Sequence, residues 1–120
     1  MDRPTIPPSL EPPRFPYFER ENGVTYLAWD PPEGLLELST QILYHYKIRS
    51  IVHSEYMFQA TTDDQRRTSL VQFERILAKH GVCAGFVVTM QAVYTDMLRD
   101  GFVLGKSRSI SITEVLPFCK

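Results

Sequence analysis

The sequence predicts an α+β fold that is mainly helical, with a three-helix core, a C-terminal β-hairpin and an extended, proline-rich N-terminal arm. Eight of the nine prolines lie within residues 1–32, and proline is excluded from helix interiors and central strands. Apolar residues recur at helical spacing between residues 33 and 99, and they alternate with polar residues after Gly101. We therefore divide the chain into an arm with a short hairpin, residues 1–32, and a small domain, residues 33–120.

Length and charge limit the classes of function. The chain has 120 residues, enough for one domain with one core. Its formal net charge of −1 gives no general attraction to nucleic acid or anionic membranes, so any such binding needs a local patch. No apolar run reaches the roughly 18 residues of a spanning helix, so we expect no membrane insertion. Without a recognisable signal peptide, we expect a cytoplasmic or nuclear protein with reduced cysteines.

The arm is expected to be extended, and it carries aromatic residues beside its prolines. These residues are Phe15, Tyr17 and Phe18. The arm can pack on its own domain or dock on a partner protein, and the sequence leaves both alternatives open. Asn22-Gly23 predicts a tight turn between residues 17–21 and 24–29, because both residues tolerate positive φ.

Two helices are predicted between residues 33 and 81. The first begins near Glu33, and the second follows the capping-box pair Ser69 and Gln72 and ends at Gly81. The apolar stripe of the first helix is Leu35, Leu38, Ile42, Leu43 and Tyr46, and that of the second is Leu70, Phe73, Ile76 and Leu77. Residues 48–58 fit either a helix or a strand, because β-branched and aromatic residues are frequent there.

A third helix is predicted over about residues 84–99, with Gly101 as its C-cap. Two strands around Gly105 are expected to follow as a hairpin, because Ile110 and Ile112 alternate with small polar residues.

The order of these elements resembles the winged-helix family. The segments that carry the resemblance are "LVQFERILAKHG", "VVTMQAVYTDMLRDGFV" and "LGKSRSISITEV", with Leu98 to Gly101 closing the third helix. The resemblance implies that this helix enters a DNA major groove. Residues 84–98 contain no Lys, Arg or Asn, however, and phosphate contacts depend on such cations. This departure from the family pattern favours a role in protein assembly.

A second resemblance is to an EF-hand loop and its exit helix, in "TTDDQRRTSLVQFERIL". With Asp63 at position 1 of the loop, Glu74 falls at position 12, as the family requires. Position 5 is Arg67, a cation where calcium needs an oxygen ligand. The resemblance therefore implies at most a degenerate, metal-free EF-hand pair.

The sequence predicts no enzyme, no cofactor and no metal site. His80 and Cys83 form one pair of potential ligands, whereas a structural zinc site uses four. No nucleophile elbow, phosphate-binding glycine loop or catalytic pair of acids is recognisable. The segment "RRTS" matches the preference of basophilic kinases, which makes Ser69 a candidate phosphosite beside a helix N-terminus.

The preferred function is a non-enzymatic protein–protein interaction module, a small subunit or adaptor of a larger complex. The candidate partner-binding residues are Phe15, Tyr17, Phe18, Trp29, Tyr44, Tyr46 and Tyr56. One alternative is a winged-helix nucleic-acid-binding protein, in which Arg66, Arg67, Lys106 and Arg108 contact phosphates. Another is a degenerate EF-hand-like regulatory domain.

Overall fold

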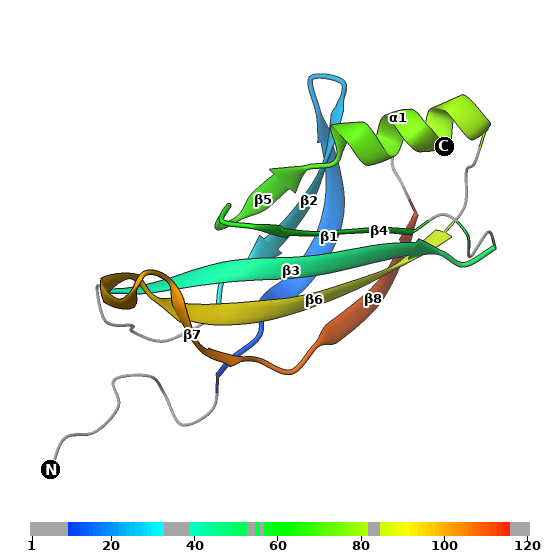
Figure 1. The fold of residues 1–120 in the computed structure, drawn as a ribbon. Coiled ribbons are helices and arrows are strands. Elements are labelled where there is room, and N and C mark those ends of the chain that lie inside the picture. The colour runs from blue at the N-terminus through cyan, green and yellow to red at the C-terminus, as the bar shows by residue number, and fades with distance from the viewer. Residues whose placement is uncertain (1–9, 33–38, 53–54, 56, 82–84, 116–120) are drawn as a thin grey trace, which may run out of the picture.

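The protein is a mainly β structure, with 62% of the described residues in strands. The computed structural model describes residues 10–32, 39–52, 55, 57–81 and 85–115. In these residues two antiparallel sheets, here called sheet A and sheet B, are accompanied by one α-helix (Figure 1). Sheet A has the order β1-β2-β5, formed by β1 (Arg14–Glu21), β2 (Val24–Asp30) and β5 (Arg67–Ser69).

Sheet B is the larger sheet and is built around two long paired strands. These are β3 (Thr40–Ser50) and β6 (Gly85–Asp96), which pair from Thr40 opposite Asp96 to Ser50 opposite Phe86. The strand β4 (Met57–Thr62) joins the free side of β3. The strands β7 (Phe102–Lys106) and β8 (Ile110–Val115) both pair with β6, and η1 (Met97–Arg99) connects β6 to β7.

The prediction of a mainly helical fold with a three-helix core is wrong. The predicted first helix overlaps β3, and the predicted third helix is β6 followed by η1; residues 33–38 lie outside the described residues. The buried residues of these segments instead alternate along the strands: Ile42, Tyr44, Tyr46 and Ile48 in β3, and Phe86, Val88, Met90, Ala92 and Tyr94 in β6. Their aromatic and β-branched side chains suit a pleated surface, and the pairing of β3 with β6 selects the two-residue period.

The predicted second helix is confirmed as α1 (Val71–His80). Gly81 ends it in the left-handed conformation, with φ 68°, and its N–H bonds back to the last turn. The predicted capping box is wrong, because the N-cap residue is Leu70. Ser69 instead accepts a hydrogen bond from the Val71 N–H at 3.2 Å. The local signals of this segment thus place the helix correctly, with its start displaced by a residue or two.

The winged-helix resemblance is wrong, as a family assignment and as a description of the C-terminus. The described residues contain one α-helix, so no recognition helix precedes a wing. The strands β7 and β8 do not form the predicted hairpin with each other, because each pairs with a different half of β6. Between them, Ser107 bonds to Ala92 through both its N–H and its hydroxyl oxygen.

The EF-hand resemblance is also wrong. The segment after Asp63 leads into the strand β5, where Arg67 pairs with Glu19 and Glu21 across sheet A. Glu74, the residue at the twelfth loop position, contacts Arg20 and Thr25. These residues hold α1 and β5 against the β1–β2 hairpin, and they are not arranged around a cation site.

The hairpin predicted from Asn22-Gly23 is confirmed, since β1 and β2 pair on either side of this turn. Asn22 and Gly23 have φ 53° and 78°, as a two-residue turn between twisted strands requires. Further along β1 the register slips between Arg14 and Tyr17, and Phe15 lies in this bulge with φ 54°. The left-handed conformation suits glycine and strains a residue with a Cβ.

We expect Phe15→Gly to stabilise the fold by about 1 kcal/mol, because it removes the strain of a left-handed Cβ. Little packing is lost, since the Phe15 side chain is 71% exposed. Urea unfolding measures the effect, with Tyr17→Gly as the control in the same strand. A loss of stability equal to that of the control would contradict the expectation.

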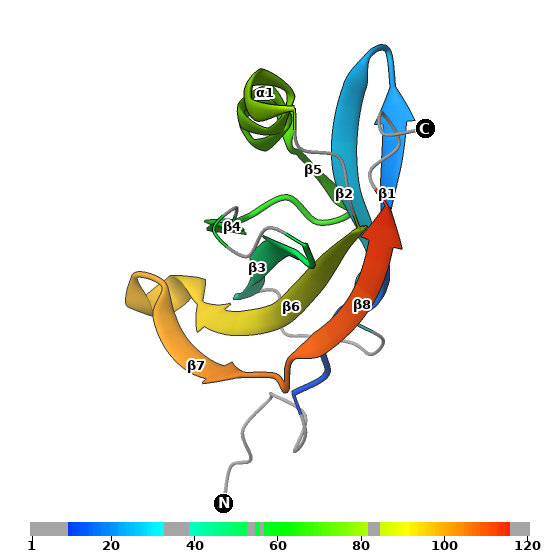
Figure 2. The ribbon, with the colours of Figure 1, turned by 90° about the vertical axis from the view of Figure 1, so that its right-hand side faces the viewer.

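Sheet A and α1 pack on the same face of sheet B and enclose the core between them (Figure 2). Phe73 of α1 lies between Phe58 of β4 and Phe86 of β6, with ring centroids 5.5 and 5.6 Å apart. Trp29 of β2 packs on Tyr44 of β3, with centroids 4.9 Å apart. Burial of these rings is the main source of stability.

The described part of the proline-rich arm packs on its own domain. Pro12 and Pro13 are buried, and the Tyr94 hydroxyl donates to the Glu11 carbonyl at 2.8 Å. Leu10 packs against Gly105, where a Cβ would collide with it. Residues 1–9 lie outside the described residues, so the alternative that the arm docks on a partner stays open for them.

The buried Tyr44 hydroxyl has no hydrogen-bond partner in the described structure, and neither has Trp29 Nε1. Burial raises the pKa of Tyr44 to about 12, and the nearby Trp29 indole opposes that rise without meeting hydrogen-bond geometry. Burial also raises the pKa of Tyr46 and of Tyr94. All three side chains are therefore held as neutral phenols.

We expect Tyr44→Phe to leave stability at pH 7 within about 1 kcal/mol of the natural chain, or to raise it, because the lost hydroxyl has no partner. The natural chain should lose stability as the pH rises from about 10 towards 12, since the unfolded chain releases the Tyr44 proton first. Tyr44→Phe should lose less stability over the same pH range. Urea unfolding at pH 7, 10 and 11 measures both effects, and equal alkaline losses would contradict the assignment.

Candidate functional site: the open face of sheet B

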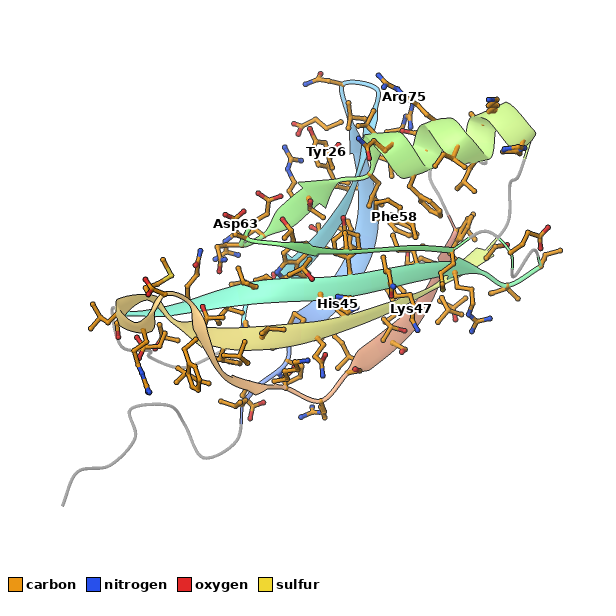
Figure 3. All side chains as sticks on the ribbon, viewed as in Figure 1. Tyr26, His45, Lys47, Phe58, Asp63 and Arg75 are labelled. Atoms are coloured by element: carbon orange, nitrogen blue, oxygen red, sulfur yellow. The ribbon has the colours of Figure 1, made fainter. Side chains whose placement is uncertain are left out.

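One face of sheet B packs on the core, and the other, here called the open face, points away from sheet A and α1. Cross-strand partners share a face of a sheet, so the register defines which residues belong to it. Four successive rows of this face are Met57, Arg49, Val87 and Thr113; Gln59, Lys47, Thr89 and Ser111; Thr61, His45 and Gln91; Leu43, Val93 and Lys106. Figure 3 shows His45 and Lys47 along β3, whereas Phe58 points towards α1.

The open face is basic. Lys47 and Arg49 are exposed and lie two residues apart on β3, and Lys106 lies across β6 from them. None of the residues in the four rows is Asp or Glu. In the described residues, the ion pairs lie on sheet A and α1, where Glu19, Glu21 and Glu74 neutralise arginines. A chain with a net charge of −1 therefore carries a face of positive potential.

A pocket of about 360 Å³ is hollowed into the open face across β4, β3, β6 and β7. It is lined by His45, Thr61, Gln91, Val93, Val103 and Lys106. The ring Nδ1 of His45 lies 3.2 Å from the Thr61 hydroxyl, and among the described residues the other ring nitrogen has no hydrogen-bond partner. The Gln91 amide donates to the Ser107 carbonyl at 2.8 Å. Val93 and Val103 thus form the apolar walls of the pocket, and the polar residues, with Lys106 as the single lysine, form its rim.

Most of the residues proposed for partner binding are buried. Phe18, Trp29, Tyr44 and Tyr46 are between 0% and 8% exposed and belong to the core. Phe15 and Tyr17 remain at the surface, 71% and 44% exposed, on the outer side of β1. Tyr56 lies outside the described residues. The pairing of β3 with β6 turns Tyr44 and Tyr46 to the same buried face.

The cations proposed for phosphate contacts are spread over both sheets. Arg67 lies 4.0 Å above the Tyr26 ring, and its two carboxylate partners raise its pKa further above the ordinary arginine range. Lys106 lines the pocket of sheet B, while Arg66 and Arg108 are exposed at strand ends. The candidate phosphosite Ser69 is exposed, with its hydroxyl bonded to the α1 N-terminus.

His45, Lys47, Arg49 and Gln91 were not recognised as site residues from the sequence. The signal for the three residues of β3 is the alternation in residues 41–49, in which Gln41, His45, Lys47 and Arg49 share one set of alternate positions with Leu43. Assigning these residues to a helix hid the alternation. The pocket also needs β6, which only the sheet pairing brings beside β3, and β7, which pairs with β6.

Metal-binding and membrane-spanning features were searched across the described residues. No group of three or more His, Cys, Asp or Glu side chains there is arranged to hold a metal ion. No helix in that part of the chain is long and apolar enough to cross a membrane. Cys83 and Cys119 lie outside the described residues.

The chain matches no family model, no curated protein and no solved structure.

Proposed function

We propose that the protein is a non-enzymatic protein-binding module whose open face of sheet B binds an acidic, extended segment of a partner protein. The observation that carries the proposal is the composition of that face. Lys47, Arg49 and Lys106 stand on it among hydroxyl and amide side chains, without a carboxylate in its rows. Complementary charge steers association and selects partners, and the hydroxyl and amide groups provide further hydrogen bonds.

An acidic protein segment fits this face better than a nucleic acid. Single-stranded nucleic acids bind by stacking their bases on aromatic side chains, and the four rows of the open face contain no aromatic residue except the His45 ring. Duplexes are held by many phosphate contacts, typically about 6 to 10, and the rows carry three permanent cations. Apolar residues such as Val87 and Val93 interrupt the cations, as expected of a face that contacts protein.

Binding also fits the face better than catalysis. General acid–base catalysis pairs groups within hydrogen-bond reach, and the group bonded to His45 Nδ1 is the hydroxyl of Thr61 rather than a carboxylate. Lys47 and Arg49 project from the strand into solvent, where they attract anions without being held in a closed site. This arrangement supports recognition of a charged chain.

The test is a titration with a fluorescein-labelled ten-residue peptide of alternating Glu and Thr, amidated at its C-terminus. We expect binding that weakens with salt and falls about tenfold in the Lys47→Glu/Arg49→Glu double variant, because attraction becomes repulsion. In an NMR titration, the amides of residues 41–49 and 87–95 should shift.

The matched control is Arg75→Glu, which reverses an exposed cation on α1, remote from the open face (Figure 3). It should bind the peptide as the natural chain does. Equal losses in both variants, or tighter binding of a ten-nucleotide single-stranded DNA than of the peptide, would overturn the proposal.

A further inference from the structure

We infer that the pocket of the open face binds a carboxylate carried by a short apolar group, and that its ligand is the C-terminal residue of the acidic partner segment. The inference deepens the proposed function and rests on it. It is drawn from the lining of the pocket, its place at one end of the basic residues of β3, and the spacing of those residues.

The polar rim of the pocket suits a carboxylate. Lys106 supplies an ammonium group, and in the described residues no ion pair occupies it. Beside it, His45 uses Nδ1 towards Thr61 and has Nε2 left for a ligand. Gln91 donates one amide hydrogen to the Ser107 carbonyl, which fixes the amide at the rim with a second hydrogen to offer. Hydrogen bonds from charged donors to a carboxylate are among the stronger ones.

The walls of the pocket suit a small apolar side chain. Val93 of β6 and Val103 of β7 line it, and Val103 is 46% exposed, so its surface is available for burial by a ligand. The volume of about 360 Å³ accommodates one branched side chain together with a terminal carboxylate. An apolar wall beside a cationic rim selects a terminal residue such as leucine over an internal glutamate, which offers no apolar branch.

The remaining cations fix where the acids of the partner must lie. From His45 at the pocket, Lys47 and Arg49 follow at intervals of two residues along β3, each about 6.7 Å further on. An extended peptide repeats with the same period. With its terminal residue in the pocket, acids two and four residues before the terminus therefore face Lys47 and Arg49. The preferred ending is Glu-Thr-Glu-Thr-Leu with a free carboxylate.

Other occupants of the face fit less well. A second copy of this chain would need a free acidic strand, and Glu19 and Glu21 on β1 are both engaged by Arg67 at 2.7 and 2.6 Å. A free carboxylic acid shares the chemistry of the pocket, but it makes no use of Lys47 and Arg49. The acidic C-terminal segment is the occupant that uses the pocket and both cations.

The experiment is a double-mutant cycle with two fluorescein-labelled peptides that end in Glu-Thr-Glu-Thr-Leu, one with a free and one with an amidated C-terminus. We expect the free carboxylate to bind the natural chain about tenfold more tightly. In Lys106→Met, which keeps an apolar stem at this exposed position, both peptides should bind more weakly than to the natural chain, because the open face loses a cation, and the two peptides should bind equally. A peptide with a free C-terminus whose two glutamates are moved by one position should bind more weakly than the original peptide with a free C-terminus.

The outcomes separate the inference from the proposed function. If Lys47→Glu/Arg49→Glu weakens binding of the amidated peptide, but the free carboxylate does not increase the affinity for the natural chain, the pocket inference fails and the proposed function stands. If neither peptide binds, both fail. A free-carboxylate advantage that persists in Lys106→Met overturns the role of the pocket, and Val103→Glu provides a second variant that should remove the advantage. Displacement of the peptide by an equal concentration of 4-methylpentanoate would identify a small carboxylic acid as the ligand and overturn the C-terminal segment.

Discussion

Phe73→Ala is expected to destabilise the protein by about 3–5 kcal/mol, the largest effect of a single substitution considered for this chain. Phe73 is 2% exposed and stands between Phe58 and Phe86, so it joins α1 to two strands of sheet B. Its removal leaves a cavity in the aromatic contact and deprives α1 of its main attachment. A helix of ten residues has little stability without such packing.

Urea unfolding followed by fluorescence and by far-ultraviolet circular dichroism measures this loss. The matched control is Ile76→Ala on the same helix, where the side chain is 47% exposed and the cost should stay below about 1 kcal/mol. The expectation fails if Phe73→Ala costs no more than Ile76→Ala. Such a result would mean that α1 is held by its contacts with sheet A, through Glu74 and Arg20.

Ser107→Ala is expected to cost about 1–3 kcal/mol, much more than an ordinary surface serine. Ser107 is 4% exposed, and its hydroxyl oxygen accepts a hydrogen bond from the Ala92 N–H at 2.9 Å. The same hydroxyl donates to the Arg108 carbonyl at 2.8 Å. This contact fills the gap in pairing between β7 and β8, so its loss leaves the Ala92 N–H buried without a partner.

Ser111→Ala is the control for this prediction, because Ser111 lies on β8 at the surface and its hydroxyl contacts, among the described residues, only that of Thr89, at 3.0 Å. We expect a cost within about 0.5 kcal/mol. Hydrogen exchange adds a local readout: in Ser107→Ala the Ala92 amide should lose protection more than the amides of β3. Uniform loss of protection across sheet B, or equal stability of the two variants, would contradict the local role of Ser107.

Short-range signals in the sequence determined two elements of this fold. The hairpin turn at Asn22-Gly23 follows from the tolerance of two adjacent residues for positive φ. The helix α1 follows from apolar spacing over ten residues and from the glycine that ends it. In both segments the residues that decide the conformation are neighbours in the chain, so the pattern is complete within a single window of sequence.

The rest of the fold was decided by the tertiary structure, as residues 40–50 illustrate. Ile42, Leu43 and Tyr46 fit one side of a helix, while Ile42, Tyr44, Tyr46 and Ile48 fit one side of a strand. A strand is stable only with a partner, and the longest pairing of β3 is with β6, whose paired residues lie 36 to 56 residues further along the chain. The pairing decides the period, buries Tyr44 and Tyr46, and turns Lys47 and Arg49 outward.

The candidate site depends on the same long-range pairing. The sequence by itself determined which cations and hydroxyls the chain possesses, and it identified Lys106 as a candidate contact. Only the sheet places His45 beside Gln91, which lies 46 residues further along the chain, and Lys106 beside Val93 on the preceding strand. The physical reason is that a strand satisfies its backbone hydrogen bonds outside its own segment, whereas a helix satisfies them within it. Which residues meet on the open face of sheet B is therefore determined by the pairing of the strands.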